Sequence, residues 1–403
     1  MHPRLHYFSL ISTDKLNHRF GANFHVGPAS RKVLGTTLAL LSAKVRPVVV
    51  SALIPYRRGT SYSSIERIER IPYVRLFALG RGAFRRLTAS VSFLFYTISV
   101  VRSNDAVLLY NAFPEYILAA FYRFLIGHRA ILDVEDGPRV DERGPRGAMN
   151  IISFHILRAL CDQKVVTVSK ALAETLKLTK YHVNYGVSFQ TRNSKPPTER
   201  FRADAPLSIL YGGAIMPETG SDLFCKAVRQ LADNHPKLRV TFHITGVYDS
   251  TFLEGLRLNQ PNDCETEIIV HGDLTAAEYN ALLRSMDVGL CLKLPSHSMG
   301  QTTFPSKVVE ICAAGVLLCT TRVSDVPDIF DDNNAVVLKN EEVDELVGAI
   351  ANICHNKEEM QHRAHCGRLM VEHRFGVTKV GSDLRAFIFA ESPVTQPLAA
   401  GST

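Results

Sequence analysis

The sequence contains no tryptophan and no hydrophobic run long enough to cross a membrane. A spanning helix needs about 20 consecutive apolar residues, and the longest uncharged stretch in the basic region, residues 87–101, is shorter than that. The first 20 residues carry charges throughout and lack the apolar core of a signal peptide. We therefore expect a cytoplasmic protein without a membrane-spanning helix.

Cysteine pairs with metal-ligand spacing are also missing. None of the eight cysteines belongs to a Cys-x-x-Cys motif, and several lie in apolar strand or helix patterns. This usage favours reduced, buried thiols in the cytosol over disulfides or a zinc site. The eight are Cys161, Cys225, Cys264, Cys291, Cys312, Cys319, Cys354 and Cys366.

Three nucleotide and metal motifs are absent as well. The sequence has no Gly-x-Gly-x-x-Gly fingerprint, and it has no P-loop, which argues against a nucleoside triphosphatase. An Asp-x-Asp motif of metal-dependent transferases is not evident, because Asp325 and Asp328 are too widely spaced and are expected to start a helix. We therefore expect no metal and no resident cofactor.

The composition is that of a soluble globular protein, with 46% hydrophobic and 21% charged residues. The formal net charge is +7. A mild basic excess suits phosphate-bearing ligands, an anionic membrane surface or nucleic acid. No RRM, KH or zinc-finger pattern is present, so a nucleic-acid partner is not expected.

Strands alternate with helices along both halves of the chain, which predicts an α/β fold with two Rossmann-like, doubly wound parallel-sheet domains. We expect the first domain at residues 1–191, a linker at 192–204 and the second domain at 205–376, with a last helix at 377–391 packing back on the first domain. The expected strands are residues 5–10, 47–53, 106–110, 130–134 and 165–168 in the first half, and 207–211, 238–245, 268–271, 288–292, 316–319 and 335–338 in the second.

Residues 304–315 form the most informative stretch. We expect a buried helix with Ser306 as its N-cap and Gly315 just after its end. Lys307 lies at the positive end of the helix dipole, where a bound anion would offset its cost. Glu310 needs a partner if it is buried. The two side chains are i and i+3, so a simple ion pair between them is the alternative to ligand binding.

Several segments together resemble the retaining GT-B glycosyltransferases of the family 4 type. No single segment is specific, but the combination is, and it spans most of the chain. The resemblance implies two Rossmann-like domains facing across a cleft, with a nucleotide-sugar donor on the second domain and the acceptor on the first. The segments are residues 131–137, 166–169, 210–213, 268–272, 285–290, 304–315 and 373–376.

The resemblance implies specific donor-binding residues. Glu310 matches the second glutamate of the family's Glu-x7-Glu motif, a ligand of the donor ribose, whereas the first would fall at Thr302. The family's Arg and Lys near the glycine turn would fall at Ala214 and Thr219, so Lys307 is the best remaining cation for the diphosphate. The donor-binding candidates are Gly213, Gly272, Gly300, Thr302, Thr303, Lys307 and Glu310.

In the first domain, Glu135 and Asp136 follow a buried strand, where catalytic groups gather in such sheets. Either carboxylate can orient the acceptor hydroxyl. The alternative is a plain turn, with Arg139 or Arg143 as its ion pair.

A second loop of the first domain also contains candidates. Gly27, Ser30 and Arg31 open the first long helix and can face the diphosphate, unless they only cap that helix.

The stretch from Arg57 to Tyr96 interleaves arginines with aromatic residues. This composition fits an interfacial segment on an anionic bilayer, and would make the protein peripheral on the inner face of the plasma membrane. The alternative is a solvated face on helices whose aromatics are core. The residues are Arg57, Arg58, Arg67, Arg70, Arg75, Arg81, Arg85 and Arg86 with Tyr73, Phe77, Phe84, Phe93, Phe95 and Tyr96.

The sequence thus predicts a hexosyltransferase-type enzyme. It would move a sugar from a nucleoside diphosphate sugar, its co-substrate, to a surface-polysaccharide or lipid-linked oligosaccharide acceptor. Two alternatives stay open, a GT-B-fold epimerase acting on the nucleotide sugar itself and a catalytically silent sugar-nucleotide-binding scaffold.

Overall fold

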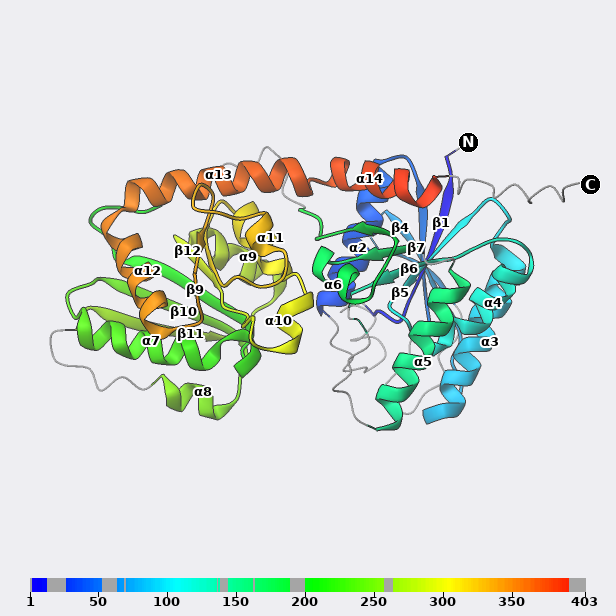
Figure 1. Ribbon diagram of the computed structural model, residues 1–403, viewed down its shortest axis with the longest axis horizontal. Coiled ribbons are helices and arrows are strands. Elements are labelled where there is room, and N and C mark those ends of the chain that lie inside the picture. Colours follow the sequence, from blue (N-terminus) through cyan, green and yellow to red (C-terminus); the bar gives the residue numbers. More distant parts are fainter. Residues whose placement is uncertain are drawn as a thin grey trace, which may run out of the picture. The chain divides into compact units, whose positions relative to one another are not determined.

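The computed structural model describes residues 2–12, 27–52, 64–68, 70–135, 137, 144–161, 164–188, 200–256 and 264–390. The chain forms two compact units. The first unit comprises Met1–Val166, Thr179–His182 and Val377–Thr403, and the second comprises Thr167–Leu178 and Val183–Gly376. Each unit is built around its own sheet with helices packed against it (Figure 1).

The first sheet has eight strands in the order β3-β4-β2-β1-β5-β6-β7-β8. The central strand β1 pairs in parallel with β2 and β5, and β2–β4 and β5–β6 are also parallel. Only the pairing of β3 with β4 is antiparallel among the registers described. The strands are β1 Arg4–Ser9, β2 Arg46–Ser51, β3 Ser64–Ile68, β4 Ile71–Arg75, β5 Ala106–Tyr110, β6 Ile131–Val134, β7 Lys164–Thr167 and β8 Lys180–Val183.

Helices cover both sides of this sheet. Figure 1 shows α3, α4 and α5 together on one side, with α2 and α14 on the other. Right-handed crossovers produce this division, because the chain moves in opposite directions from β1 to β2 and from β4 to β5. The elements are α2 Gly27–Ser42, α3 Gly82–Val100, the 3-10 turn η1 Pro114–Tyr116, α4 Ile117–Leu125, α5 Pro145–Leu160 and α14 Val377–Phe389.

The second sheet has six parallel strands in the order β11-β10-β9-β12-β13-β14. The strands are β9 Leu207–Ala214, β10 Val240–Val247, β11 Thr266–Gly272, β12 Val288–Cys291, β13 Leu317–Thr320 and β14 Val336–Val337. The helices are α6 Lys170–Thr175, α7 Ser221–Asn234, α8 Ser250–Gly255, α9 Ala276–Ser285, α10 Ser298–Thr302, α11 Ser306–Ala313, α12 Val343–His355 and α13 Lys357–Phe375, with 3-10 turns η2 Pro217–Thr219 and η3 Val326–Asp328.

The predicted α/β class with two parallel-sheet domains is confirmed. Ser169 caps α6 by accepting a hydrogen bond from the Leu172 amide, and Thr275 and Glu278 form the expected capping box. The sequence did not reveal β3, β4, β8 and α5. β3 is a short, half-exposed edge strand, so it lacks the buried apolar run that marks the central strands.

The last helix of the first unit, α14, packs against α2. The contact is close because Gly381 has no side chain, and a Cβ there would lie 2.6 Å from the Ala39 carbonyl carbon. The division into units also places residues 167–178 and 183–188 with the second sheet, although they precede the linker that the sequence suggests.

All eight cysteines lie among the described residues, and none forms a disulfide. Burial raises the pKa of the Cys161 and Cys319 thiols to about 12. These two thiols are therefore neutral and unreactive at physiological pH. In the described ranges, no helix combines the length and hydropathy that a membrane span requires.

Candidate functional site

The second sheet changes direction between β9 and β12. These strands are neighbours, yet the chain runs from β9 outward to β10 and β11 before it returns to β12. Open α/β sheets bind ligands at the carboxyl ends of the strands at such a switch point. The residues at this position are Gly212 and Gly213 near the end of β9, and Leu292, which follows β12.

The Lys307 amine lies directly against Gly213. A Cβ at Gly213 would lie 2.7 Å from the Lys307 Cε and would overlap its Nζ. The φ of +108° at Gly213 also favours glycine. The sequence predicted both residues as donor ligands, and the structure brings them together at the switch point.

Helix α11 delivers Lys307 to this position. Its Val308, Val309 and Ile311 are buried, and Ile311 packs so closely on β12 that a Cβ at Gly289 would lie 2.8 Å from the Ile311 Cγ1. Lys307 and Glu310 are half-buried on the remaining helix face. Helical periodicity therefore separates the apolar packing face from the two candidate ligands.

The Lys307 charge also affects a residue at the end of β12. Burial raises the pKa of the Cys291 thiol, and the positive charge of Lys307 partly offsets this rise. Cys291 is the last residue of β12, so the amine influences the carboxyl ends of both β9 and β12. A cation at the ends of two adjacent parallel strands is well placed to bind an anion.

One expectation about the start of α11 was wrong. Ser306 is the first helical residue and not the cap, because Pro305 occupies the N-cap position and no side chain caps the helix. The short helix α10 precedes α11. Gly300 in α10 packs on backbone, since a Cβ there would lie 2.8 Å from the Leu294 carbonyl carbon.

A hydrogen bond from Ser169 holds the end of α10. The Ser169 hydroxyl donates to the Thr302 carbonyl oxygen while it also accepts from the Leu172 amide at 2.9 Å. The start of α6 is therefore anchored to the predicted donor segment. Thr302 and Thr303 are half-buried.

Gly272 ends β11, two strands away from β9. Its register partner on β10 is Thr245, which in turn pairs with Gly212, and the Thr245 hydroxyl donates to the Gly272 carbonyl oxygen at 2.7 Å. Gly272 and Gly212 therefore lie in one row at the carboxyl edge of the sheet. No atom lies within 4 Å of a Cβ built at Gly272, so this position is open.

Thr219 has a structural role where the family's lysine is missing. Its hydroxyl donates to the Ala214 carbonyl oxygen at 2.8 Å and accepts from the Met216 amide at 2.9 Å. The hydroxyl thereby closes the turn between β9 and α7. Among the described residues, the Lys307 amine, from another part of the chain, lies against Gly213.

In the first unit, Glu135 follows β6 and is half-buried. Its carboxylate accepts a hydrogen bond from the Tyr110 hydroxyl, and its amide donates to Asn111 Oδ1 at 2.9 Å. Asn111 adopts a φ of +57°, a strained conformation that asparagine tolerates better than most residues. Asp136, Arg139 and Arg143 lie outside the described residues.

A second polar group lies beside Glu135. The buried Asp133 accepts hydrogen bonds from Lys32 Nζ at 2.9 Å and from the Tyr7 hydroxyl. Burial and the Asp133 charge raise the pKa of Tyr7 well above its ordinary value, so this hydroxyl stays protonated and donates. The Lys32 amine also lies 5.5 Å from the centre of the Tyr110 ring.

Sequence reasoning missed Tyr7, Lys32, Tyr110 and Asn111. Tyr7 lies on β1 and Tyr110 ends β5, Asn111 follows β5, and Lys32 lies on α2. Strands β1 and β5 form the switch point of the first sheet, with β2 on one side and β6 on the other. The sequence feature that could have revealed them is the presence of polar atoms at the ends of two buried strands. It was weak because a tyrosine in a strand usually belongs to the core.

Of the predicted residues Gly27, Ser30 and Arg31 at the start of α2, Ser30 makes a hydrogen bond within the first unit. The Ser30 hydroxyl donates to the Ser12 carbonyl oxygen at 2.7 Å, which ties the first turn of α2 to the residues after β1. Gly27 begins α2, and the Arg31 side chain is exposed. A role of these three residues toward a diphosphate stays a prediction.

The stretch from Arg57 to Tyr96 does not form one interfacial segment. The side chains of Tyr73, Arg75, Arg85, Phe93 and Tyr96 are buried. They belong to the core because β4 and α3 turn these positions inward. The predicted interfacial role is wrong for them, and Arg57 and Arg58 lie outside the described residues.

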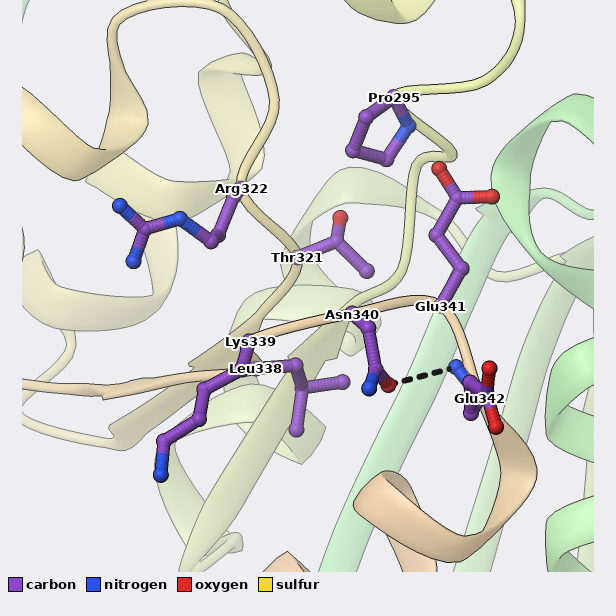
Figure 2. Close-up of a pocket in the computed structure, with 8 residues that line it drawn as sticks. All are labelled: Pro295, Thr321, Arg322, Leu338, Lys339, Asn340, Glu341 and Glu342. Carbon is purple, nitrogen blue, oxygen red and sulfur yellow. Dashed lines mark hydrogen bonds between the residues drawn. The ribbon is translucent and has the colours of Figure 1, made fainter.

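Figure 2 shows a pocket of about 480 Å3 elsewhere in the second unit. It lies between the segments that follow β12, β13 and β14, and no predicted donor residue lines it. The Glu341 carboxylate at its rim accepts from the Ser296 amide at 2.7 Å and from the Ser296 hydroxyl at 2.6 Å. This pocket is therefore separate from the pair formed by Gly213 and Lys307.

Part of the sequence matches a known family, and the fold of nearly the whole chain is similar to that of solved structures. Residues 206–356 match the family model described as glycosyl transferases group 1. No curated protein matches the chain significantly in sequence.

Several solved structures match nearly the whole chain. HepE from Anabaena, solved with UDP and glucose, has a TM-score of 0.67 at 12% identity, covering 97% of this chain and 100% of that one. A glycosyltransferase from Rickettsia africae has a TM-score of 0.65 at 13% identity, covering 97% and 100%. Sucrose-phosphate synthase from Thermosynechococcus elongatus has a TM-score of 0.64 at 13% identity, covering 95% and 97%. The chain therefore has the GT-B fold, and the match to the glycosyl transferases group 1 model lies within its second domain.

Proposed function

We propose that the protein transfers a sugar from a nucleoside diphosphate sugar to a surface-polysaccharide or lipid-linked oligosaccharide acceptor in the cytoplasm. The observation that carries the proposal is the Lys307 amine against Gly213, at the switch point of a domain that matches the glycosyl transferases group 1. The structure of HepE with UDP and glucose supports this donor class.

In the proposed reaction, the bond between the anomeric carbon and the diphosphate oxygen breaks. A new bond forms to an acceptor hydroxyl oxygen, which releases its proton, and the nucleoside diphosphate leaves with the bonding electrons. Charge develops on the leaving diphosphate, and a fixed cation and backbone amides stabilise such charge. Lys307 would supply the cation, so the transfer is proposed to need no metal.

The other candidates have complementary roles in the proposal. Glu310 accepts hydrogen bonds from the donor ribose hydroxyls. Gly213, Gly272, Gly300, Thr302 and Thr303 offer backbone close to the sugar and the diphosphate. Glu135, held by Tyr110 and Asn111, orients the acceptor hydroxyl. Retention of the anomeric configuration and a hexose donor follow from the family resemblance.

The test incubates the purified full chain with UDP-glucose, UDP-N-acetylglucosamine and GDP-mannose. Each donor is tested with and without a polyprenyl-diphosphate-linked sugar in detergent micelles. We expect nucleoside diphosphate release and a lengthened lipid-linked product with one donor, only when the acceptor is present. Sugar interconversion without acceptor would identify an epimerase instead. Binding without release or interconversion would identify a silent scaffold, and either outcome would overturn the proposal.

A further inference from the structure

The first unit exposes an unusual number of large hydrophobic side chains on three neighbouring helices. Twelve of the twenty such side chains found exposed in the described residues lie on α3, α4 and α5. Phe95, Leu125 and Ile152 are 66%, 64% and 58% exposed. Val100 is the last residue of α3, and we call the other eleven residues the apolar face. They are Phe84, Leu87, Val91, Phe95, Ile98, Leu118, Phe121, Phe124, Leu125, Ile152 and Ile156.

The residues of the apolar face lie on helices that pack against one another. On α3 its residues follow one another at spacings of three and four, which places them on one stripe. The opposite stripe of α3, with Phe93 and Tyr96, fills the core. Helix α4 packs against both α3 and α5, and Figure 1 shows the three helices side by side.

Exposing an apolar surface of this kind to water is unfavourable in free energy. Soluble monomers rarely expose contiguous apolar patches of more than a few hundred square ångströms, and larger patches mark contacts with proteins or membranes. By contrast, the exposed hydrophobics of the second unit are Met216, Val247, Leu253, Val270 and Leu369, which lie on separate elements. A specific partner for the first unit is therefore indicated.

The charges around the face select the kind of partner. Helices α3, α4 and α5 contain no Asp or Glu. Among the acids in the segments that connect these helices, Asp105, Glu115 and Asp133 are buried and Glu135 is half-buried, whereas Asp136, Asp141 and Glu142 lie outside the described residues. Arg81, Arg102 and Arg129 are exposed. Arg86 is also exposed, but its Nη1 lies 3.4 Å from Glu115 Oε1 and forms an ion pair with it.

Arg129 shows how these arginines can border an apolar phase. Its guanidinium lies 4.0 Å from the centre of the Phe124 ring, and its Nη1 donates to the Phe124 carbonyl oxygen at 3.1 Å. An arginine that covers an aromatic ring with its charge at the edge is typical of membrane interfaces. A second copy of the chain would instead bring two arginine-bordered faces together, and the three helices carry no acid to pair with those arginines.

We propose that α3, α4 and α5 form a face by which the protein binds an anionic lipid bilayer. The aliphatic and aromatic side chains enter the boundary between headgroups and acyl chains, and the arginines contact lipid phosphates. This surface differs from the stretch from Arg57 to Tyr96, because α4 and α5 contribute half of it and because several residues of that stretch are core. It does not depend on the proposed transfer reaction.

The absence of tryptophan permits a direct test of insertion. The variant Phe95→Trp carries the only indole of the chain, on the apolar face, and Leu253→Trp carries it on α8 of the second unit. We expect the emission of the Phe95→Trp protein to shift to shorter wavelength with phosphatidylcholine vesicles that contain phosphatidylglycerol. The Leu253→Trp emission should stay unchanged. An unchanged spectrum for Phe95→Trp would overturn the proposal.

Sedimentation with the same vesicles measures the contribution of the face. The triple variant Leu87→Ser, Phe95→Ser, Leu125→Ser should bind at least about tenfold more weakly than the native protein. The matched triple Val247→Ser, Leu253→Ser, Val270→Ser should bind normally. Each of Arg81→Gln and Arg102→Gln should weaken binding roughly fivefold at low salt. Equal binding of the two triple variants would contradict the assignment.

Analytical ultracentrifugation without lipid tests whether a second copy of the chain, and not a bilayer, covers the apolar face. The native full chain is expected to be monomeric at the concentrations used for sedimentation. Self-association that the face triple abolishes, together with no vesicle binding, would show that a second copy covers the face and would overturn the bilayer proposal.

Discussion

His6 is a buried side chain through which the stability of the first unit depends on pH. Its Nε2 lies 3.1 Å from Asp105 Oδ2 and its Nδ1 lies 3.0 Å from the Tyr96 hydroxyl. Since a carboxylate only accepts, Nε2 carries the proton and Nδ1 accepts from the tyrosine. Burial lowers the pKa of His6, although Asp105 partly raises it. The neutral imidazole therefore satisfies both partners.

This arrangement predicts that the first unit loses stability in mild acid. The native state disfavours protonation of His6, so the unfolded chain binds the proton more readily as the pH falls through about 6.5. The contribution is therefore present above this pH and is lost below it. We expect the melting temperature to fall between pH 7 and pH 5, and to fall less in His6→Gln, measured by circular dichroism. An exposed control, His373→Gln, should behave like the native protein, and an equal fall in all three would refute the role of His6.

Individual site residues differed in how well the sequence revealed them. Lys307 and Glu310 were visible because a cation and an acid interrupt an otherwise apolar helix. Lys32 was not, because it is an ordinary polar position on α2 until folding brings it to Asp133. A long-range contact of this kind leaves no local pattern in the sequence.

At the scale of elements, α11 connects packing to ligand binding. Its buried residues fix the helix on β12, and Gly315 with a φ of +72° ends it as expected. The helix was predictable because its apolar residues, its polar interruptions and its glycine all lie within one short segment. Its N-terminal cap was not, because either Pro305 or Ser306 fits the local sequence and only the chain path decides between them.

Variants of α11 test its role in donor binding. Lys307→Ala and Glu310→Gln should each weaken the binding of UDP or GDP by roughly 1–3 kcal/mol, the usual loss for a hydrogen bond to a charged group. Isothermal titration calorimetry with the full chain measures this loss. Lys339→Ala, an exposed lysine of the pocket in Figure 2, is the control and should bind normally. Unchanged affinity in both α11 variants would make the helix purely structural.

At the scale of the molecule, the end of the chain completes the first unit. Helix α14 follows α13 of the second unit in sequence but packs on α2. The Ser42 hydroxyl donates to the Val377 carbonyl oxygen at 3.2 Å, and Arg385 Nη1 donates to the Ala43 carbonyl oxygen at 2.8 Å. The stability of the first unit therefore depends on residues from both ends of the sequence.

Gly381→Leu tests this dependence. The new side chain would meet the Ala39 backbone, which cannot move aside as a side chain can, so we expect a loss of about 1–3 kcal/mol in the stability of the first unit. Hydrogen exchange should become faster in α2 and α14 and stay unchanged in α7. The control Gly348→Ala, on an exposed part of α12 with open space around it, should stabilise the second unit by about 0.5–1 kcal/mol. Unchanged exchange in α2 would contradict the prediction.

The sequence by itself determined the alternation of strands and helices, the two-sheet α/β class and the helix that bears Lys307 and Glu310. Each of these follows from hydrophobic periodicity and from capping within a single segment. Only the tertiary structure decided that Lys307 lies against Gly213, that Lys32 and Tyr7 share Asp133, and that three helices pool their exposed apolar side chains. The physical reason is that such contacts join segments far apart in the chain, and their geometry depends on how whole elements pack, which local periodicity does not encode.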